Sequence, residues 1–199
     1  MRPVLYLATQ NKHKVEELSA LLKHNFDIRD LSTLSLTEEI PETGNTLAEN
    51  SLQKARYIAE KFQVTCLADD SGLEVEALGG APGVYSARYA GEPKDDQANL
   101  QLLLSNLSGK TNRRARFVTV LTYYDNDTYT SFEGEIQGSI VEAPRGTQGF
   151  GYDPVFQPQY ETRTFAEMSL AEKNLIAHRA RALEKFINYL DETQKCADQ

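Results

Sequence analysis

PVLYLATQNKHKVEELSALLKH, residues 3–24, contains the pattern that decides the fold. The apolar run over 3–8 is typical of a buried strand, and the polar turn TQN follows it. Beyond the turn, apolar residues recur at helical spacing: Val15, Leu18, Leu21 and Leu22. A strand, a polar turn and a helix in this order are the opening unit of an α/β fold.

Strand and helix patterns also fill the rest of the chain. Apolar runs predict strands over 26–31, 64–70, 114–125, 128–143 and 155–156, and helical spacing predicts helices over 46–62, 95–107 and 169–190. The turn Asp125–Asn126–Asp127 joins two of these strands into a hairpin. Ser169 and Glu172 form a capping-box pattern at the start of the last helix. The residues therefore predict a mixed α/β fold with one long hairpin.

Composition narrows the class of protein. A length of 199 residues suits a single domain over 1–199, and a formal net charge of -8 argues against a broad binder of nucleic acid. Cys66 and Cys196 are far apart in the sequence and predict reduced thiols rather than a disulfide framework. No segment resembles a signal peptide or a membrane span, so we expect a soluble cytoplasmic protein without a membrane partner.

The junction TQNKHK, residues 9–14, is the first candidate site. Backbone N–H groups and the positive end of a helix favour an anion at such a turn, where Lys14 adds a charge and Asn11 an amide. The alternative is an N-cap followed by a solvated first turn. The turn has neither the Gly-rich P-loop pattern nor the dinucleotide fingerprint.

Asp69 and Asp70 end the apolar run VTCLADD, residues 64–70. Because strand side chains alternate between faces, the two carboxylates are expected to point in opposite directions and not to grip one ion together. One acid can face a cleft while the other ties down the Ser-Gly turn that follows, and two turn aspartates are the alternative. Glu42 can complete a Mg²⁺ site with Asp70, unless its acidic loop is only a solvated charge run.

The helix predicted over 46–62 has two faces. One face carries the apolar stripe Ala48, Leu52, Ala55, Ala59 and Phe62. The opposite face is polar and carries Asn50, Lys54, Tyr57 and Lys61. Lys54 is thus expected on the side of the helix away from the apolar stripe.

GFGYDP, residues 149–154, is a third candidate. Its two glycines around Phe150 permit a flat ligand to approach the backbone closely. Phe150 or Tyr152 can stack on a base, while Asp153 or backbone groups read the edge of that base. The alternative is a Gly-rich turn with its aromatic side chains in the core.

The segment KNLIAHR, residues 173–179, is the fourth candidate. On one continuous helix, His178 is almost opposite the apolar stripe of Ile176 and Leu183, so it is not expected to be a core histidine. Lys173 and Arg179 flank that stripe on different sides. Either the helix starts later than Ser169 or a cleft wraps around it, and a solvated basic surface is the alternative.

These residues lie in blocks that resemble the inosine/xanthosine triphosphate pyrophosphatase family. The blocks span nearly the whole chain: TQNKHK, PETGNTLAENSLQKA, LADDSGLEVEALGGAPGVYSARYAG, GFGYDPVF and FAEMSLAEKNLIAHRARAL. The resemblance implies Mg²⁺-dependent hydrolysis of ITP, dITP and XTP to the nucleoside monophosphate and pyrophosphate, which removes them from the nucleotide pool. It also implies a homodimer and an elongated mixed β-sheet flanked by helices, with two lobes and a central substrate cleft.

The resemblance further implies roles for single residues. Asp70 matches the general base and metal-linked carboxylate, Glu42 matches the acidic metal position, and Asp69 is left as a supporting group. The phosphate motif matches Thr9, Asn11 and Lys14, the basic residue of the second helix matches Lys54, and Ser71 is placed beside the substrate. The base-binding loop matches Phe150, Gly151, Tyr152 and Asp153, and the segment that reads the purine 6-oxo edge matches Lys173, His178 and Arg179.

Two positions depart from the family pattern. Ala177 stands where Ser usually precedes His-Arg, so a hydroxyl that could cap the helix or touch the base is lost, and Gln10 stands where Asn or Gly is commoner. Neither change removes an acid or a cation, so activity is expected to survive. Other functions left open are a pyrophosphatase of modified pyrimidine nucleotides and a nucleotide sensor without turnover.

Overall fold

The computed structural model describes residues 2–36 and 38–197, with backbone alone for Gln194, Cys196 and Ala197. Its strands are β1 (Val4–Ala8), β2 (Asp27–Arg29), β3 (Cys66–Val75), β4 (Arg114–Asp125), β5 (Thr128–Ile140) and β6 (Phe156–Pro158). Its α-helices are α1 (Lys12–Leu22), α2 (Leu47–Phe62), α3 (Asp96–Asn106), α4 (Leu170–Ile176) and α5 (His178–Ala197). The strands form a sheet in the order β2-β1-β3-β4-β5-β6. Strand β1 is parallel to β2 and β3, and β6 is antiparallel to β5, so the predicted mixed α/β fold is confirmed.

Strand β3 is longer than its sequence pattern predicted. It continues beyond Asp70 to Val75, so the predicted turn at Ser71-Gly72 is wrong. The reason is that Leu73 and Val75 continue the alternation of buried side chains, and this period of two keeps the backbone extended. The aspartate pair therefore lies in the middle of a strand and not at its end.

The hairpin between β4 and β5 is confirmed. Asn126 and Asp127 form its two-residue connection, and both have positive φ, 46° and 62°. Two successive residues with positive φ match a type I′ turn, whose twist suits the strands that it joins. Asn and Asp tolerate this left-handed conformation better than most residues do, which explains why they stand at this turn.

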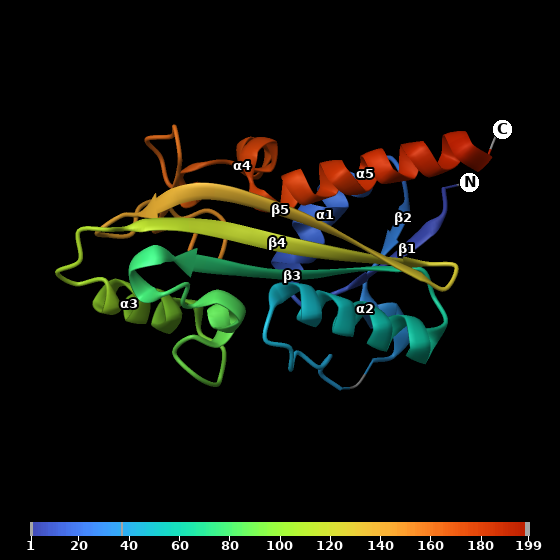
Figure 1. The fold of residues 1–199 in the computed structure, drawn as a ribbon, viewed down its shortest axis with the longest axis horizontal. Helices are drawn as coiled ribbons and strands as arrows, with labels where there is room; N and C mark the ends of the chain where they lie inside the picture. The colour runs from blue at the N-terminus through green and yellow to red at the C-terminus, as the bar shows by residue number, and fades with distance from the viewer. Residues whose placement is uncertain (1, 37, 198–199) are drawn as a thin grey trace. The chain divides into compact units, whose positions relative to one another are not determined.

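The described chain divides into two compact units. Unit 1 contains the residues up to Asp70, Thr119–Gly134 and the residues from His178, and unit 2 contains Ser71–Val118 and Glu135–Ala177. In unit 1, α1 and α5 cover one face of the sheet and α2 covers the other (Figure 1). Alternation along the strands builds both cores, since Leu67 packs with α1 and α5 while Cys66 and Ala68 pack with α2.

Unit 2 has its own hydrophobic core. Leucines of α3, the end of β3 and the start of β4 pack together there with residues of the Gly-rich segment and its flanks. Its largest members are Leu100, Leu103, Phe117, Tyr152, Phe156 and Phe165. Tyr152 comes from the third candidate segment, 149–154, and Ala177, a smaller member of the same core, comes from the fourth, 173–179, so this core supports both segments.

Two further features concern the composition. The Cys66 thiol is free and buried, and burial raises its pKa to about 12, whereas the side chain of Cys196 lies outside the described residues. Among the helices that the structure describes, none is long and apolar enough to cross a membrane.

Candidate functional site

Asp69 and Asp70 point to different groups in unit 1, as strand alternation predicts. The carboxylate of Asp69 meets the side chains of Lys14 and Arg179, and that of Asp70 meets Lys54. Both aspartates are buried, with 0% and 7% of their surface exposed. Such burial of carboxylates requires compensating charge, which two cations supply to Asp69 and Lys54 supplies to Asp70.

The Asp69 side chain is the centre of a buried ion network. Its Oδ1 lies 2.5 Å from Lys14 Nζ, and its Oδ2 accepts a 2.6 Å hydrogen bond from Arg179 Nε. Arg179 also pairs with Glu17 of α1, and both side chains are buried. Burial alone would raise the pKa of Asp69, but Arg179 and Lys14 hold it well below its ordinary value. This geometry suits the supporting role expected of Asp69.

Lys54 joins the two predicted metal ligands. Its Nζ donates to Asp70 Oδ1 at 2.8 Å and to Glu42 Oε1 at 3.0 Å, and also to the Asp69 carbonyl oxygen at 2.7 Å. Burial favours the neutral amine, but the attraction of Asp70 and Glu42 outweighs it and raises the pKa of Lys54. Lys54 and Asn50 are buried, so the prediction that they lie on the face of α2 away from the core is wrong. Their polar atoms are buried because partners from the preceding loop and β3 satisfy them.

The second oxygen of Asp70 differs from the rest of this cluster. Asp70 Oδ2 is buried and has no hydrogen-bond partner among the described residues. A buried carboxylate oxygen normally has a partner, so this atom is a natural acceptor for a bound group. Across the described part of the chain, no three His, Cys, Asp or Glu side chains are grouped as a metal site. Mg²⁺ is typically held by one or two carboxylates with substrate phosphates and water, and Glu42 and Asp70 fit that smaller requirement.

The junction between β1 and α1 has the geometry of an N-cap. Asn11 Oδ1 accepts hydrogen bonds from the backbone N–H groups of His13 and Lys14, and Thr9 Oγ1 accepts one from the Asn11 N–H. Burial lowers the pKa of Lys14, against the attraction of Asp69. The side chain of Asn11 is thus the N-cap of α1, as the alternative interpretation of this turn expected. Anion binding at the turn stays a prediction.

The predicted last helix is wrong in one respect, because the structure breaks it in two. Helix α4 ends at Ile176, Ala177 is extended (φ -65°, ψ 155°), and α5 begins at His178. The Ser169–Glu172 capping box at the start of α4 is confirmed. The break changes the direction of the side chains that follow, so the helical-wheel placement of His178 away from the core fails.

His178 is buried, with 4% of its surface exposed. Its backbone packs closely on β5, because a Cβ built on Gly134 would lie 2.2 Å from the His178 carbonyl oxygen. Arg179 is also buried and directs its guanidinium to Asp69 and Glu17. These two members of the fourth candidate segment belong to unit 1, whereas Lys173 belongs to unit 2.

The GFGYDP segment brings two of its predicted residues, Phe150 and Asp153, together with Lys173. Asp153 Oδ2 accepts hydrogen bonds from Lys173 Nζ at 2.6 Å and from the Phe150 N–H at 3.0 Å. The Lys173 ammonium also lies 5.0 Å from the centre of the Phe150 ring, within cation–π range. Gly149 has φ +74°, and a Cβ there would lie 2.0 Å from Asp153 Oδ2, so glycine is required for this close turn.

The two aromatic residues of this segment have different environments. Tyr152 is buried, and its hydroxyl donates to the Ser86 carbonyl oxygen at 2.8 Å, so its side chain is part of the hydrophobic core of unit 2. Phe150 is half-buried, which leaves part of its ring accessible. The Gly151 N–H donates to Asp96 of α3 at 2.9 Å, and Ser71 belongs to β3 within unit 2.

The family model of the Ham1 family matches residues 5–189. The chain belongs to the Ham1 family. A relative named dITP/XTP pyrophosphatase from Flavobacterium psychrophilum is 46% identical over 185 residues, which cover 93% of this chain and 97% of the relative. A protein of the same name from Bacillus subtilis is 46% identical over 189 residues, covering 93% and 96%.

Solved structures show the same Ham1 fold. The Ham1 protein of Staphylococcus aureus superposes with a TM-score of 0.87 at 37% identity and covers 96% of this chain and 99% of its own. The Ham1 protein of Coxiella burnetii gives a TM-score of 0.86 at 38% identity, with 96% and 99% covered. The family resemblance inferred from the sequence blocks and the α/β fold are therefore confirmed.

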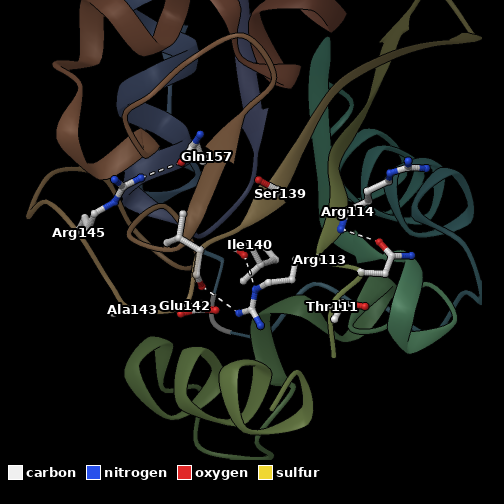
Figure 2. Close-up of a pocket in the computed structure, with 11 residues that line it drawn as sticks. Thr111, Arg113, Arg114, Ser139, Ile140, Glu142, Ala143, Arg145 and Gln157 are labelled. Atoms are coloured by element: carbon white, nitrogen blue, oxygen red, sulfur yellow. Dashed lines mark hydrogen bonds between the residues drawn. The ribbon is translucent and has the colours of Figure 1, made fainter. Parts of the chain in front are cut away.

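A groove of about 870 Å³ lies in unit 2 of this Ham1-family chain, apart from the predicted site residues. Figure 2 shows Arg113 in its middle, where it donates to the carbonyl oxygens of Ile140 and Val141. Arg145 at the side donates to Gln157. Arg113 thus holds the backbone at the end of β5, and Arg145 holds the Gln157 side chain of β6, so we assign the groove no part in the chemistry.

Sequence reasoning missed Glu17, Asn50 and Gln53. Glu17 lies 162 positions from its partner Arg179, and a glutamate on a helix is usually solvated, so no local signal marks it. Asn50 and Gln53 lie in the block PETGNTLAENSLQKA. The local pattern that could have marked them is a glycine, Gly44, placed shortly before a helix that carries several polar residues. Both contact the loop that carries Glu42.

Proposed function

We propose that this chain hydrolyses dITP, ITP and XTP to the nucleoside monophosphate and pyrophosphate. The observation that carries the proposal is a pair of carboxylates on one lysine, the half-buried Glu42 and the buried Asp70, with Asp70 Oδ2 left without a partner among the described residues. Curated relatives that match nearly the full chain are named dITP/XTP pyrophosphatases. The charges of Lys54 and of the two carboxylates suit a phosphorylated substrate, and the names of the relatives point to dITP and XTP.

The reaction assigned to unit 1 is attack of water on the α-phosphorus. An oxygen–phosphorus bond forms to water, the bond from the α-phosphorus to the bridging oxygen breaks, and pyrophosphate leaves. Asp70 Oδ2 orients the water and accepts its proton. Lys14 and Lys54 stabilise the negative charge that develops on the leaving pyrophosphate. Thr9 and Asn11 are proposed to contact the phosphates, and Ser71 to lie beside the substrate.

Mg²⁺ is the proposed cofactor, and Glu42 and Asp70 would hold it. When bound, it neutralises charge on the phosphate oxygens. The two carboxylates already share one cation, Lys54, so their side chains can approach the same positive charge. This shared contact supports the assignment of Glu42 and Asp70 as the ligands.

The base is assigned to residues of the GFGYDP segment and to the positions around Ala177. Phe150 is the proposed stacking partner, in preference to Tyr152, because the Tyr152 ring is buried and its hydroxyl is bonded. Gly151 and Asp153 shape the loop around that ring. Lys173, His178 and Arg179 are proposed to favour a 6-oxo purine, since their donors would be left opposite the amino group of adenine.

Steady-state kinetics on dITP, XTP, ITP, GTP and ATP test the proposal, with Mg²⁺ and after chelation. We expect kcat/KM for the first three to exceed that for ATP by about 10²-fold or more. Asp70→Asn keeps the shape and removes the charge, and should lower kcat by about 10²–10⁴-fold. Equal rates on all five purines, or a wild-type rate for Asp70→Asn, would refute the proposal. A panel of modified pyrimidine triphosphates separates the alternative substrate class.

We further propose that the chain acts as a cytoplasmic homodimer, without nucleic acid or membrane partners. Light scattering coupled to size exclusion would give the mass of the particle in solution. A mass of 22.3 kDa, that of one chain, would refute the dimer. The predicted single two-lobed domain over 1–199, with a substrate cleft, also stays a prediction.

A further inference from the structure

The loop before α2 is fastened to that helix through its backbone. Four successive N–H groups each donate to a side chain of α2: Thr43 to Gln53 (2.9 Å), Gly44 to Asn50 (2.7 Å), and Asn45 and Thr46 to Glu49 (2.6 and 3.2 Å). Thr46 is the N-cap of the helix and Glu49 completes its capping box, so those bonds belong to helix initiation. The bonds of Gln53 and Asn50 are not part of helix initiation, because they hold Thr43 and Gly44, which lie before the helix.

Gln53 and Asn50 hold this segment in different ways. Gln53 contacts Thr43 twice, because its Oε1 accepts from the backbone N–H and its Nε2 donates to Oγ1 at 3.0 Å. Asn50 is buried, with 1% exposed, and its Oδ1 contacts Gly44. A Cβ on Gly44 would lie 2.6 Å from Glu49 Cβ and 2.9 Å from Asn50 Oδ1, so the loop touches the helix where only glycine fits.

The residue that this arrangement orients is Glu42. It directly precedes Thr43, and its carboxylate meets Lys54, the residue directly after Gln53. Lys54 in turn meets Asp70. One short stretch of α2 therefore fixes both the backbone next to Glu42 and the position of its side chain.

We propose that Gln53, with the support of Asn50, is a positioning residue that holds Glu42 beside Asp70 for a divalent cation. This inference rests on the proposed function, because Glu42 and Asp70 are the proposed Mg²⁺ ligands. Gln53 acts through the backbone of Thr43 and not by contact with substrate or metal. A ligand that is fixed in advance loses less conformational freedom on binding, so losing the Gln53 bonds weakens metal affinity rather than chemistry.

The test compares Gln53→Ala with Gln53→Glu and with Gln101→Ala as matched control. Gln101 is an exposed residue of α3, so its truncation removes the same side chain from a helix without touching the loop. Gln53→Glu keeps a side-chain acceptor for the Thr43 N–H. The readouts are amide hydrogen exchange of residues 42–46 without metal, Mn²⁺ affinity by electron paramagnetic resonance with an α,β-imido analogue of dITP, and the Mg²⁺ dependence of dITP hydrolysis.

Gln53→Ala should speed exchange over 42–46 and weaken Mn²⁺ affinity by about tenfold, which corresponds to about 1.4 kcal/mol. The Mg²⁺ concentration for half-maximal rate should rise equally, while kcat at saturating Mg²⁺ stays within about twofold of wild type. Gln53→Glu should recover most of the affinity, and Gln101→Ala should match the wild type.

Three results would overturn the positioning role of Gln53. They are equal Mn²⁺ affinity for Gln53→Ala and Gln101→Ala, faster exchange with unchanged Mn²⁺ affinity, and a lower kcat at saturating Mg²⁺ with unchanged affinity. Failure of the proposed function looks different, since the wild-type chain would then release no pyrophosphate from any purine triphosphate. The exchange and Mn²⁺ measurements would still decide the role of Gln53 in that case.

Discussion

Asp69→Asn should reduce stability far more than Asp70→Asn, although the two residues are neighbours. Asp69 is fully buried, and its two oxygens meet Lys14 at 2.5 Å and Arg179 at 2.6 Å. An asparagine keeps one acceptor but turns an N–H donor toward the other cation. Removing one partner of a buried ion pair typically costs about 3–5 kcal/mol, because the remaining charges lose their compensation.

Asp70→Asn has a milder effect on the fold by the same reasoning. Its Oδ1 can still accept from Lys54, and Lys54 keeps its bonds to Glu42 and to the Asp69 carbonyl. The oxygen that becomes an amide nitrogen has no hydrogen-bond partner among the described residues to lose. We therefore expect a cost of about 1 kcal/mol or less, in the range of one ordinary hydrogen bond.

The pH dependence provides a second check on Asp69. Its pKa is held well below the ordinary value in the folded chain, so it contributes stability that is present above the unfolded pKa of about 3.9 and is lost as the pH falls through the folded pKa. Asparagine does not titrate. The difference in unfolding free energy between wild type and Asp69→Asn should therefore be largest near neutral pH and shrink below about pH 4.

Urea unfolding is the assay, followed by circular dichroism and tyrosine fluorescence. The chain has ten tyrosines and no tryptophan, so the tyrosine signal is not masked. Denaturation curves of the three proteins at several pH values give the two differences in free energy. A cost for Asp69→Asn below about 1 kcal/mol, or a difference that stays constant down to about pH 3, would show that the buried network is not what holds this part of unit 1.

Other changes have equally specific consequences. Lys54→Met leaves the carboxylates of Glu42 and Asp70 without their shared ammonium, so kcat should fall by about 10²-fold or more, while Mg²⁺ should raise Tm more than in the wild type. A Mg²⁺ titration of Tm that matches the wild type would contradict this. Gly44→Ala should lower the free energy of unfolding by about 1–3 kcal/mol, measured in urea, because its Cβ would lie 2.6 Å from Glu49 Cβ. In a Cys196→Ser background, Cys66 should resist a disulfide reagent until the chain unfolds, since it is buried with a pKa of about 12; rapid reaction of the native protein would disprove this.

Most elements of the fold can be predicted from sequence because each has its own hydrophobic period. The strands β1 and β4, the helix α2 and the two-residue hairpin turn all lie where local patterns place them. The break before His178 could not be predicted, because IAHRA contains neither Gly nor Pro and its apolar spacing continues across Ala177. Packing against Gly134 of β5, far away in the sequence, accompanies the start of the new helix there.

The candidate site was predictable in its residue types but not in its pairings. Alternation in β3 separated Asp69 from Asp70, and this separation is found in the structure. The burial of Lys54 could not be read from α2, since a lysine opposite an apolar stripe is usually solvated. It is buried because carboxylates of a loop and of β3 meet it from outside its own helix.

The bonds between 43–46 and α2 also fix the length of this segment. Each residue of a helix is rotated by about 100° from the one before, so one residue inserted or deleted between Thr46 and Asn50 would turn Gln53 and Asn50 away from the loop groups that they bind. Sequences of the Ham1 family that keep this arrangement should therefore align here without gaps. For protein engineering, this stretch is a poor choice for an epitope tag or a loop graft, although most of it lies outside regular secondary structure or at the first turns of a helix.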